Sequence, residues 1–253
     1  MFKFVIKQDA LRGIIDAIKA VVEDDIKLQI DENGFHIEAV DASNVAMVFL
    51  QAKKEAFDFY QAGKLELAMS LVTLTKYTDI KDVPVSVELD EATHRLKISQ
   101  GKTKYNMSLI DPTSIKAGPR IPQLDMPCEV VMRGSDFQDA VRAVEKVADH
   151  AIFEQDEDKF SISAKGDIDS ANVEFTLSEL TGVKHGMSRA LFSLDYLYPD
   201  MARVFAKNSI KIETGVDYPC RVSLNIGENK LISFMEVKII YINGQTNFNS
   251  KIT

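Results

Sequence analysis

The 253-residue sequence contains no apolar run close to the roughly 20 residues that a membrane-spanning helix needs. Its first residues, MFKFVIKQDA, alternate charged with apolar side chains and lack the apolar core of a signal peptide. The two cysteines, Cys128 and Cys220, provide neither a disulfide framework nor the spacing of a metal site. We therefore expect a protein without a membrane segment that stays in a reducing compartment inside the cell.

Motifs that carry enzyme chemistry are also missing. The twelve glycines never form a phosphate-binding GxGxxG or a P-loop, and HExxH and GxSxG are absent. The four histidines have no partner at ligand spacing: His36, His94, His150 and His185. The acidic run EQDEDK (154–159) could be imagined as a cation site, but between two predicted strands it is better interpreted as a solvated turn, and so is GDID (166–169). We predict no catalytic residue, no metal, no cofactor and no enzyme activity.

Prolines cluster in one stretch near the middle of the chain. Four of the seven lie in IDPTSIKAGPRIPQLDMP (110–127). Proline fixes φ and lacks a backbone N–H, so this stretch can neither continue a helix nor lie inside a sheet. The residue before each proline also favours extended conformations. The stretch therefore predicts a stiff connector with a folded unit on each side, and the chain length suits two domains.

The two halves of the chain repeat one pattern. FVIKQDALRGIIDAIKAVVEDDI (4–26) aligns position for position with VVMRGSDFQDAVRAVEKVADHAI (130–152), and GFHIEAVDASNV (34–45) resembles KFSISAKGDIDSANV (159–173). Each of the first two segments has an apolar face with helical spacing. These faces are Leu11, Ile14, Ile15, Ile18, Val21 and Val22 in the first half, and Phe137, Ala140, Val141, Val144, Val147 and Ala148 in the second. A repeat of half the chain indicates a duplicated domain rather than a short-period solenoid.

The sequence also indicates where the two long helices begin, and it predicts a second, shorter helix in each half. Asp9 is the expected start of the first helix, and Ser135 with Gln138 three residues later has capping-box spacing in the second. Shorter helices are predicted at about 70–77 and 194–207. Pro199 lies inside the last of these, so we expect a distorted or shortened first turn there.

Alternation of apolar and polar residues predicts the strands. It occurs at 26–31, 35–39, 85–90, 95–99, 105–109, 160–164 and 210–214. Such alternation is typical of antiparallel strands with one buried and one solvated face. Each half then has a strand, a helix and three strands, followed by the same again. The predicted fold class is α+β: two similar domains of antiparallel sheet with helices gathered on one face.

Charge is distributed unevenly. The chain has 30 basic and 38 acidic residues, and its net charge of −8 argues by itself against a nucleic acid partner. The predicted helical segments have no net charge, because they contain seven basic residues and seven acidic ones. The acidic residues are Asp9, Asp16, Asp136, Asp139, Glu145, Asp195 and Asp200. Three basic pairs are spaced to share a helix face: Arg12 with Lys19, Arg142 with Lys146, and Arg203 with Lys207. For one such pair, ordinary solvated helix charge is the better interpretation.

A duplicated α+β chain with a proline-rich connector and no enzyme motif resembles a known family. AVDASNVAMVFL (39–50), LIDPTSIKAGPRIPQLDMPCEVVM (109–132), KGDIDSANVEF (165–175) and LFSLDYL (191–197) are similar to segments of the DNA polymerase sliding clamps of the proliferating cell nuclear antigen (PCNA) family, above all its archaeal members. The resemblance runs from Met1 to about Ile239. It implies the DNA clamp fold, closed into a ring of three subunits with helices lining the hole, sheets outside and the proline cluster as interdomain connector.

The resemblance implies domain limits and a functional role. The N-terminal clamp domain is expected at 1–117, the connector at 118–128, the C-terminal clamp domain at 129–240 and a flexible tail at 241–253. The ring would encircle duplex DNA without sequence specificity and act as a non-catalytic processivity factor. DNA polymerase, flap endonuclease, DNA ligase and the clamp loader ATPase would dock through a clamp-interacting peptide. The expected location is cytoplasmic and nucleoid-associated in an archaeon, or nuclear in a eukaryote.

The basic residues of the helices become the expected DNA contacts under this resemblance. The set is Arg12, Lys19, Lys76, Lys81, Arg142, Lys146, Arg203 and Lys207. Contacts of this kind are made to phosphates, so they are sequence-independent and salt-sensitive. Weak basic lining on an acidic body suits a ring that is held by closure and slides. Asp195 stands where relatives often carry a basic residue, which argues against a strong DNA contact there.

The implied partner-binding pocket departs from the family at its C-terminal wall. The expected pocket residues are Val40, Asn44, Val45, Met47, Ile121, Pro122, Pro219, Met235, Glu236 and Val237. Strand core is an alternative interpretation of Val45 and Met47. Relatives carry leucine-alanine-proline-basic-isoleucine where this chain has MEVKI (235–239). Glu236 and Val237 should therefore weaken and loosen peptide docking.

Two alternating segments, TKYNMSL (103–109) and SANVEFTL (170–177), would be aggregation-prone sheet edges unless a neighbour paired with them. Head-to-tail pairing into a closed homotrimer removes both edges. The expected interface residues are Thr103, Lys104, Tyr105, Met107, Ala171, Asn172, Val173 and Phe175. The alternatives are a subunit of a heterotrimeric clamp, a non-ring DNA polymerase accessory protein, or an enzyme of similar shape.

Overall fold

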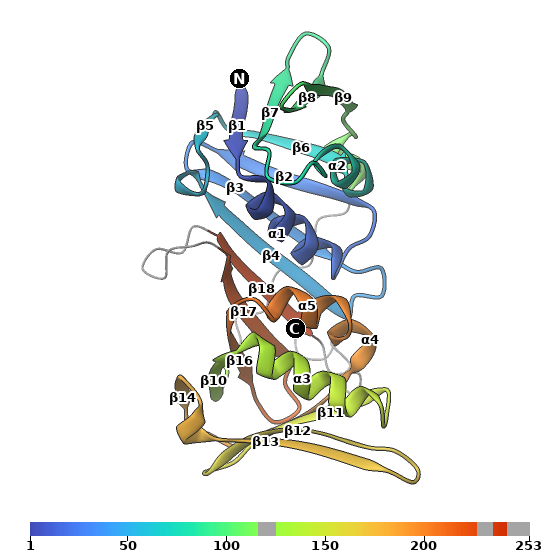
Figure 1. Cartoon of the computed structure of the whole chain (residues 1–253), viewed down its shortest axis with the longest axis vertical. Coiled ribbons are helices and arrows are strands. Elements are labelled where there is room, and N and C mark those ends of the chain that lie inside the picture. Colours follow the sequence, from blue (N-terminus) through green and yellow to red (C-terminus); the bar gives the residue numbers. More distant parts are fainter. Residues whose placement is uncertain (116–124, 227–234, 242–253) are drawn as a thin grey trace. The chain divides into compact units, whose positions relative to one another are not determined.

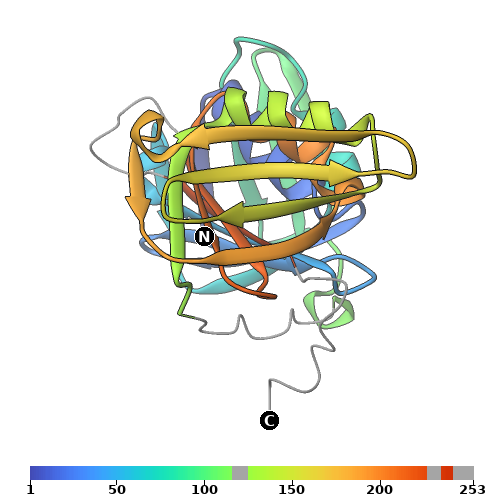
Figure 2. The same cartoon turned by 90° about the horizontal axis from the view of Figure 1, so that it is seen from below.

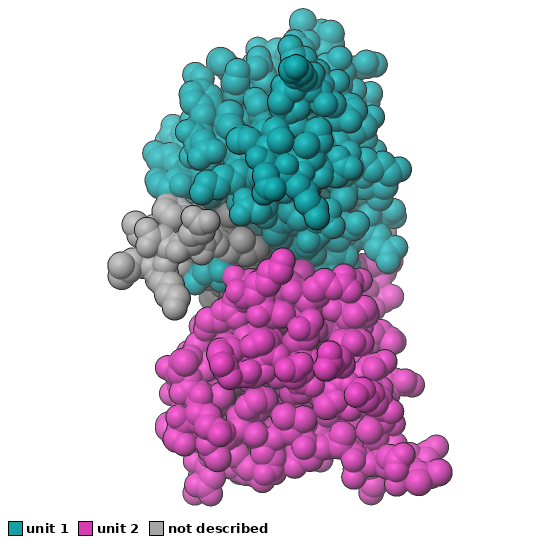
Figure 3. Space-filling model, viewed as in Figure 1, with its two compact units in different colours: residues 1–40, 48–118, 225–237 teal, residues 41–47, 119–224, 238–253 magenta. Residues whose placement is uncertain are grey.

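The computed structural model describes residues 1–115, 125–226 and 235–241, and of residues 226 and 235–241 it describes the backbone alone. The chain forms two compact units (Figure 3). Unit 1 comprises residues 1–40, 48–118 and 225–237, and unit 2 comprises 41–47, 119–224 and 238–253. Each unit therefore contains a short segment from the opposite half of the sequence. Except for Tyr241, the last residue of a strand, the predicted tail lies outside the described residues, and so does most of the predicted connector.

Unit 1 is built from two antiparallel sheets and two helices (Figure 1). Its elements are β1 (Phe2–Ile6), α1 (Gln8–Lys19), β2 (Asp25–Asp31), β3 (Gly34–Val40), β4 (Ala46–Lys53, which begins in unit 2), β5 (Phe59–Ala62), β6 (Leu65–Ser70), α2 (Leu71–Tyr77), β7 (Val85–Asp90), β8 (Arg95–Gln100) and β9 (Thr103–Ser108). One sheet has the order β5-β1-β7-β8-β9, and in the other the neighbours run β4-β3-β2-β6.

The apolar stripe of α1 positions both sheets. Leu11, Ile14, Ile15 and Ile18 are all at most 4 % exposed. They meet apolar side chains from β1, β2, β3, β6, β7 and β8, together with Leu74 of α2, around one small interior cavity. Packing of one helix face against two sheets explains why the 3.6-residue period of this segment is strict. The opposite face of α1 is left for charged side chains.

Unit 2 repeats the arrangement. Its elements are β10 (Cys128–Arg133), α3 (Gly134–Glu145), β11 (His150–Gln155), β12 (Lys159–Lys165), β13 (Ser170–Thr176), β14 (Gly182–Lys184), β15 (Ser188–Ser193), α4 (Leu194–Leu197), α5 (Asp200–Phe205), β16 (Ser209–Thr214) and β17 (Cys220–Ile226), and β18 (Met235–Tyr241) passes from unit 1 into unit 2. One sheet has the order β13-β12-β11-β15 (Figure 2), and in the other the neighbours run β14-β10-β16-β17.

Aromatic rings fill the interior of unit 2. Phe153 of β11 lies at the centre, with ring centroids 5.9 Å from Phe137, 6.1 Å from Phe160 and 5.0 Å from Phe192. Phe137 of α3 also contacts Phe205 of α5 at 5.7 Å. All five rings are at most 2 % exposed. The cluster joins α3 and α5 to one face of the four-stranded sheet, so the predicted α+β fold class is confirmed.

Four local predictions are wrong. Ser135 does not cap α3, and Asp9 does not cap α1: the helices begin at Gly134 and Gln8, with Arg133 and Lys7 at the N-cap. Gly134 begins the second helix early because its N–H donates to the carbonyl of Asn208, 2.8 Å away, and a Cβ there would lie 1.8 Å from the Phe205 oxygen. Such a close backbone approach requires glycine.

The other two corrections concern the number of elements. The helix predicted at 194–207 with a distortion at Pro199 is in fact divided there into α4 and α5, since Pro199 cannot donate an N–H to continue the first helix. Five strands, rather than the predicted four, separate the first helix of each unit from the next. The additional strands include β5, with four residues, and β14, with three. Neither contains a buried residue, so neither shows the alternation that reveals a strand.

Candidate functional site

Helix α1 presents two exposed basic residues, Arg12 and Lys19. The Nε of Arg12 lies 2.8 Å from Oδ1 of Asp16, one turn further along the helix. Lys19 is the last residue of α1, where its charge favours the negative end of the helix dipole. Within the described part of the chain, Lys19 has no ion-pair partner. One of the two charges is thus neutralised locally and the other faces solvent.

The neighbouring helix α2 contributes Lys76, which is exposed in its last turn, and the exposed Lys81 lies in the turn that follows. Neither lysine has an ion-pair partner among the described residues. Ser70 begins the helix properly, because its hydroxyl accepts from the N–H of Thr73. Since α1 packs beside α2, unit 1 carries four exposed basic residues on and next to adjacent helices.

Helix α3 shows the same division as α1. Arg142 is exposed and its guanidinium lies 3.9 Å from the carboxylate of Asp139, three residues earlier. Lys146, at the C-cap, is exposed and has no ion-pair partner in the described ranges. Arg133, which sequence reasoning missed, precedes the helix and donates to Asp136 at 2.9 Å. The charged face is therefore built from self-contained pairs plus one solvent-facing lysine.

The last predicted basic pair is on and after α5. Arg203 donates from its guanidinium to Oδ1 of Asp200 at 2.9 Å, and Lys207 is exposed two residues beyond the helix end. Asp195 is exposed on α4, where its backbone N–H donates to the hydroxyl of Ser193. Because α3 packs beside α4 and α5, unit 2 also carries four of the predicted basic residues on adjacent helices. All eight residues of the predicted set are exposed.

The two predicted interface segments are edge strands within the described sheets. β9 is the last strand of the five-stranded sheet and β13 the last of the four-stranded sheet. Each leaves one side of its backbone without a described partner strand, which is the geometry that accepts a strand from another chain. In Figure 2, β13 forms one margin of the four-stranded sheet.

Side chains along these edges differ in what they can offer to a neighbour. Tyr105 of β9 is half-buried and stacks on Tyr77 of α2, with centroids 4.2 Å apart and planes at 1°. Val173 of β13 is half-buried, and Phe175 stacks on Phe160 of the next strand. Met107, by contrast, is 2 % exposed, so only its backbone is presented at the edge. Thr103 and Ala171 are half-buried, and the exposed members of the set are Lys104 and Asn172.

The described residues of the predicted docking pocket lie in three places. Val40 ends β3 and is half-buried, and Pro219 is buried just before β17. Asn44 is exposed with a φ of 57°, Val45 is half-buried and Met47 is 4 % exposed. Burial of Met47 agrees with its alternative interpretation as strand core. Ile121 and Pro122, and the side chains of Met235, Glu236 and Val237, lie outside the described residues.

Asp41, which sequence reasoning did not single out, shapes the turn that contains Asn44 and Val45. Its Oδ1 accepts from the N–H groups of Val45 at 2.7 Å and Ala46 at 2.8 Å. Its Oδ2 accepts from the N–H of Ser43 at 2.9 Å and from the hydroxyl of Tyr196 at 3.1 Å. The aspartate before SNV is a turn signature that could have identified this role. Four hydrogen bonds to one carboxylate predetermine the backbone of the turn, all within unit 2.

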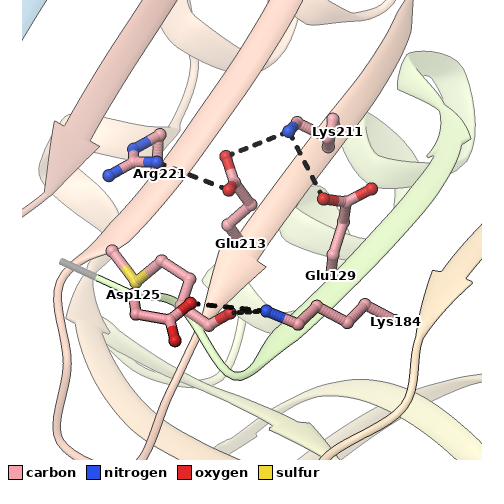
Figure 4. A network of polar contacts seen from close by, with 7 residues as sticks. Asp125, Glu129, Lys184, Lys211, Glu213 and Arg221 are labelled. Atoms are coloured by element: carbon pink, nitrogen blue, oxygen red, sulfur yellow. Dashed lines mark hydrogen bonds and ion pairs between the residues drawn. The ribbon is translucent and has the colours of Figure 1, made fainter. Parts of the chain in front are cut away.

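A polar network crosses the strands of unit 2 (Figure 4). The ammonium of Lys211 on β16 lies 3.3 Å from Glu129 of β10 and 3.4 Å from Glu213. Arg221 of β17 approaches Glu213 at 3.4 Å, and these two side chains are 19 % and 13 % exposed. Ion pairs shielded in this way are stronger than fully exposed ones, so the network fixes β10, β16 and β17 in register.

Lys184 connects this region to the end of the proline-rich segment. Its ammonium donates to the carbonyl of Met126 at 2.8 Å and lies 3.5 Å from Asp125 (Figure 4). Asp125 and Met126 are the first described residues after the gap at 116–124. The end of the predicted connector is thus held against β14.

The described residues contain no cluster of three or more His, Cys, Asp or Glu side chains that could bind a metal ion. His36 bonds to the side chain of Gln29 at 2.9 Å. Burial raises the pKa of the Cys128 thiol and that of Cys220. No helix in the described part of the chain has the length and apolar character to cross a membrane.

Residues 1–99 match the sequence model of the family described as "Proliferating cell nuclear antigen, N-terminal domain". A "DNA polymerase sliding clamp" of Methanothrix thermoacetophila is 42 % identical over 238 residues, covering 93 % of this chain and 97 % of the relative. The chain belongs to the PCNA family. A second sliding clamp, from Methanococcoides burtonii, is 37 % identical over 232 residues, covering 91 % of this chain and 94 % of that one.

Solved structures of the PCNA family share the fold. The structure described as "C-terminal region of FEN-1 bound to A. fulgidus PCNA" matches with a TM-score of 0.89 and 29 % identity, covering 96 % of this chain and 98 % of the other. PCNA from Thermococcus kodakaraensis matches with a TM-score of 0.86 at 19 % identity, covering 96 % and 100 %. The second likeness shows the fold alone.

Proposed function

We propose that this chain is a sliding clamp: a non-catalytic ring that encircles duplex DNA and tethers a replicative DNA polymerase and other DNA-processing enzymes. The observation that carries the proposal is similarity to proteins named as DNA polymerase sliding clamps over nearly the full length of both chains. The duplicated architecture and the exposed basic residues on the helices of both units support it.

The ring is proposed to be a homotrimer closed through its edge strands. Pairing β9 of one subunit with β13 of the next is a head-to-tail contact that leaves neither edge open. Exposed Lys104 on β9 can donate to a neighbouring strand, whereas exposed Glu174 on β13 is already paired with Lys159 of β12. Tyr105 and Val173 supply apolar contact at the same seam. The proposed domain limits are 1–117 and 129–240, joined by the connector at 118–128.

Duplex DNA is proposed to contact the helices. The eight exposed basic residues provide charge without a pattern of groups suited to base recognition, so the contacts would be made to phosphates and would weaken with salt. The clamp would work at the DNA of the cell, in the cytoplasm of an archaeon, in agreement with the archaeal sources of the similar clamps.

Partner enzymes are proposed to dock through a short peptide near the Asn44 turn, Pro219 and the MEVKI segment. The bound FEN-1 region in the A. fulgidus complex supports this mode of binding, and DNA polymerase, ligase and the clamp loader ATPase would use it too. In this proposal Glu236 would bring a carboxylate to a position where relatives carry alanine, and Val237 lacks the fixed φ of proline. Changing Glu236→Ala and Val237→Pro together should strengthen peptide binding by about 1–2 kcal/mol in calorimetry. Unchanged or weaker binding would refute this assignment of the segment.

Light scattering of the purified chain, followed by a primer-extension assay, tests the proposed function. The ring predicts a mass three times the 28.3 kDa of the chain and longer products when a cognate polymerase and loader are present. A monomer at micromolar concentration would exclude the homotrimer and favour a heterotrimeric clamp or a non-ring accessory protein. A trimer that leaves product length unchanged would exclude the processivity role.

A further inference from the structure

Arginines and lysines on the helices differ in their ion pairing. Arg12, Arg142 and Arg203 each lie beside an aspartate of the same helix. The companion lysines have no ion-pair partner among the residues that the structure describes: Lys19, Lys146 and Lys207. Asp16 and Asp200 contact their guanidinium groups at 2.8 and 2.9 Å, and Asp139 lies 3.9 Å from that of Arg142. In all three helices a carboxylate therefore sits beside the guanidinium, which is the group best suited to bind phosphate bidentately.

The pairing does not descend residue by residue from the duplicated sequence. In the alignment of 4–26 with 130–152, Arg12 stands opposite Gln138 and Asp16 stands opposite Arg142. Each half has its own arginine and its own aspartate, in opposite order along the helix. Two different arrangements give the same result, an arginine neutralised on the exposed face of its helix.

Helix stability explains these pairs poorly, although Asp200 lies in the first turn of α5, where a negative charge favours the helix dipole. The aspartate side chains are 42 %, 72 % and 68 % exposed at Asp16, Asp139 and Asp200, and exposed ion pairs stabilise folded proteins little. In α1 the arginine precedes the acid, which is the less favourable order for a helix. A phosphate approaching the arginine must displace the carboxylate or lie close to its negative charge. Either event weakens the contact.

We propose that Asp16, Asp139 and Asp200 limit the affinity of the clamp for duplex DNA by holding the helix arginines in ion pairs, so that phosphates are contacted mainly through the unpaired lysines. The proposal rests on the proposed function, in which these helices face DNA. Its consequence is a lining whose charge is present but partly occupied, which keeps each phosphate contact weak and short-lived while the ring moves along the duplex.

A variant with Asp16→Asn, Asp139→Asn and Asp200→Asn tests the proposal directly. Binding to a fluorescein-labelled duplex is measured by anisotropy from low to moderate KCl. Each arginine made available to a phosphate steepens the slope of log K against log[salt] by about 0.9, so the variant should bind more tightly at low salt with a slope about 1 to 3 steeper than that of the parent. An unchanged affinity and slope would overturn the proposal.

A matched control separates this effect from a change in net charge. Glu32→Gln, Glu55→Gln and Glu157→Gln together make the same charge change at exposed residues outside the helices that carry the proposed DNA contacts. The control should shift binding much less than the aspartate variant. Equal shifts in the two variants would overturn the proposal, because they would show that only total charge matters. Light scattering and thermal melting confirm that both variants assemble and fold like the parent.

A double-mutant cycle at one pair provides a second criterion. Asp139→Asn should strengthen duplex binding in the parent but have little effect when Arg142 is alanine, since the carboxylate then has no guanidinium to release. An undiminished gain in the Arg142→Ala background would overturn the proposal. Failure of the proposed function looks different: in that case Arg142→Ala with Lys146→Ala leaves duplex binding of the parent unchanged.

Discussion

Replacing Tyr77 by alanine should weaken subunit association while leaving unit 1 folded. Tyr77 ends α2, and its ring stacks face to face on Tyr105 of the edge strand β9, with centroids 4.2 Å apart. Both side chains are half-buried, so neither ring is part of the closed core. The stack fixes the orientation of Tyr105 at the edge that we assign to the ring seam. Without the Tyr77 ring, the Tyr105 side chain is free to change rotamer in the monomer. It then loses this freedom when the seam forms, which costs free energy on association.

The magnitude follows from the stack. An aromatic pair contributes about 0.5–1.5 kcal/mol beyond the area that it buries. A closed trimer has three seams, so a loss of about 1 kcal/mol at each destabilises the ring by about 3 kcal/mol, or roughly a hundredfold in the trimer association constant. Unit 1 itself should lose less than this in unfolding free energy, because the buried face of α1 and the strand ladders are untouched.

Sedimentation equilibrium over a dilution series measures the effect, with Tyr77→Phe as the matched control. Phenylalanine retains the ring and the stack and removes only the hydroxyl. The trimer of the alanine variant should dissociate into monomers at a much higher protein concentration than the trimer of the phenylalanine variant. Both variants should have similar far-UV circular dichroism spectra. Equal dissociation of the two variants would refute the role of the stack in orienting the edge.

Three further predictions concern other parts of the chain. Gly134→Ala should lower the free energy of unfolding by at least about 1–3 kcal/mol in urea titrations, since its Cβ would lie 1.8 Å from a backbone oxygen of α5; parent-like stability would contradict the close approach. Arg142→Ala with Lys146→Ala should reduce clamp loading or processivity in a salt-dependent way without changing the trimer mass, and parent-like processivity at every salt concentration would contradict DNA contact at α3. Cys128 and Cys220 should resist a thiol-specific reagent at pH 8 in the folded protein and react after unfolding, because burial raises the pKa of both thiols and disfavours the thiolate; fast reaction of the native protein would disprove this.

The elements that sequence predicted well are those whose burial repeats at a fixed period. The apolar face of α1 is spaced by the helix itself, and every polar position between its buried residues faces solvent or a neighbouring turn. Burial alternates in the same regular way along strand β2. The edge positions of β9 and β13 were also predictable, because exposed alternating strands need a partner.

What sequence could not predict depends on contacts between distant segments. The start of α3 at Gly134 is determined by Asn208 and Phe205, which lie more than one helix and several strands away in the chain. The short strands β5 and β14 form by pairing with β1 and β10, and contain too few buried residues to be recognised alone. The carboxylate of Asp41 serves a turn and the distant Tyr196 at once.

At the candidate site, the sequence predicted correctly that the basic side chains are exposed, but it did not predict their ion pairs. Spacing predicted that three basic pairs each share one helix face, and the structure has these six residues exposed, together with Lys76 and Lys81. It did not reveal that Arg12 and Arg142 are occupied by aspartates, since an acid three or four residues away can equally point elsewhere. Burial of Met47 agrees with one of the two interpretations that the sequence allowed, whereas burial of Met107 was not predicted, because an alternating strand does not show which face its domain covers.

Retention on circular DNA before and after one double-strand cut tests the central claim most directly. Clamps loaded onto a closed or nicked circle are separated from free protein by gel filtration, and the circle is then linearised with a restriction enzyme. A ring held by topology should stay on the circle through moderate salt and slide off within minutes of linearisation. Equal dissociation rates from the circle and from the cut DNA would show that the chain binds DNA by contact alone, and would contradict the account of it as an encircling clamp.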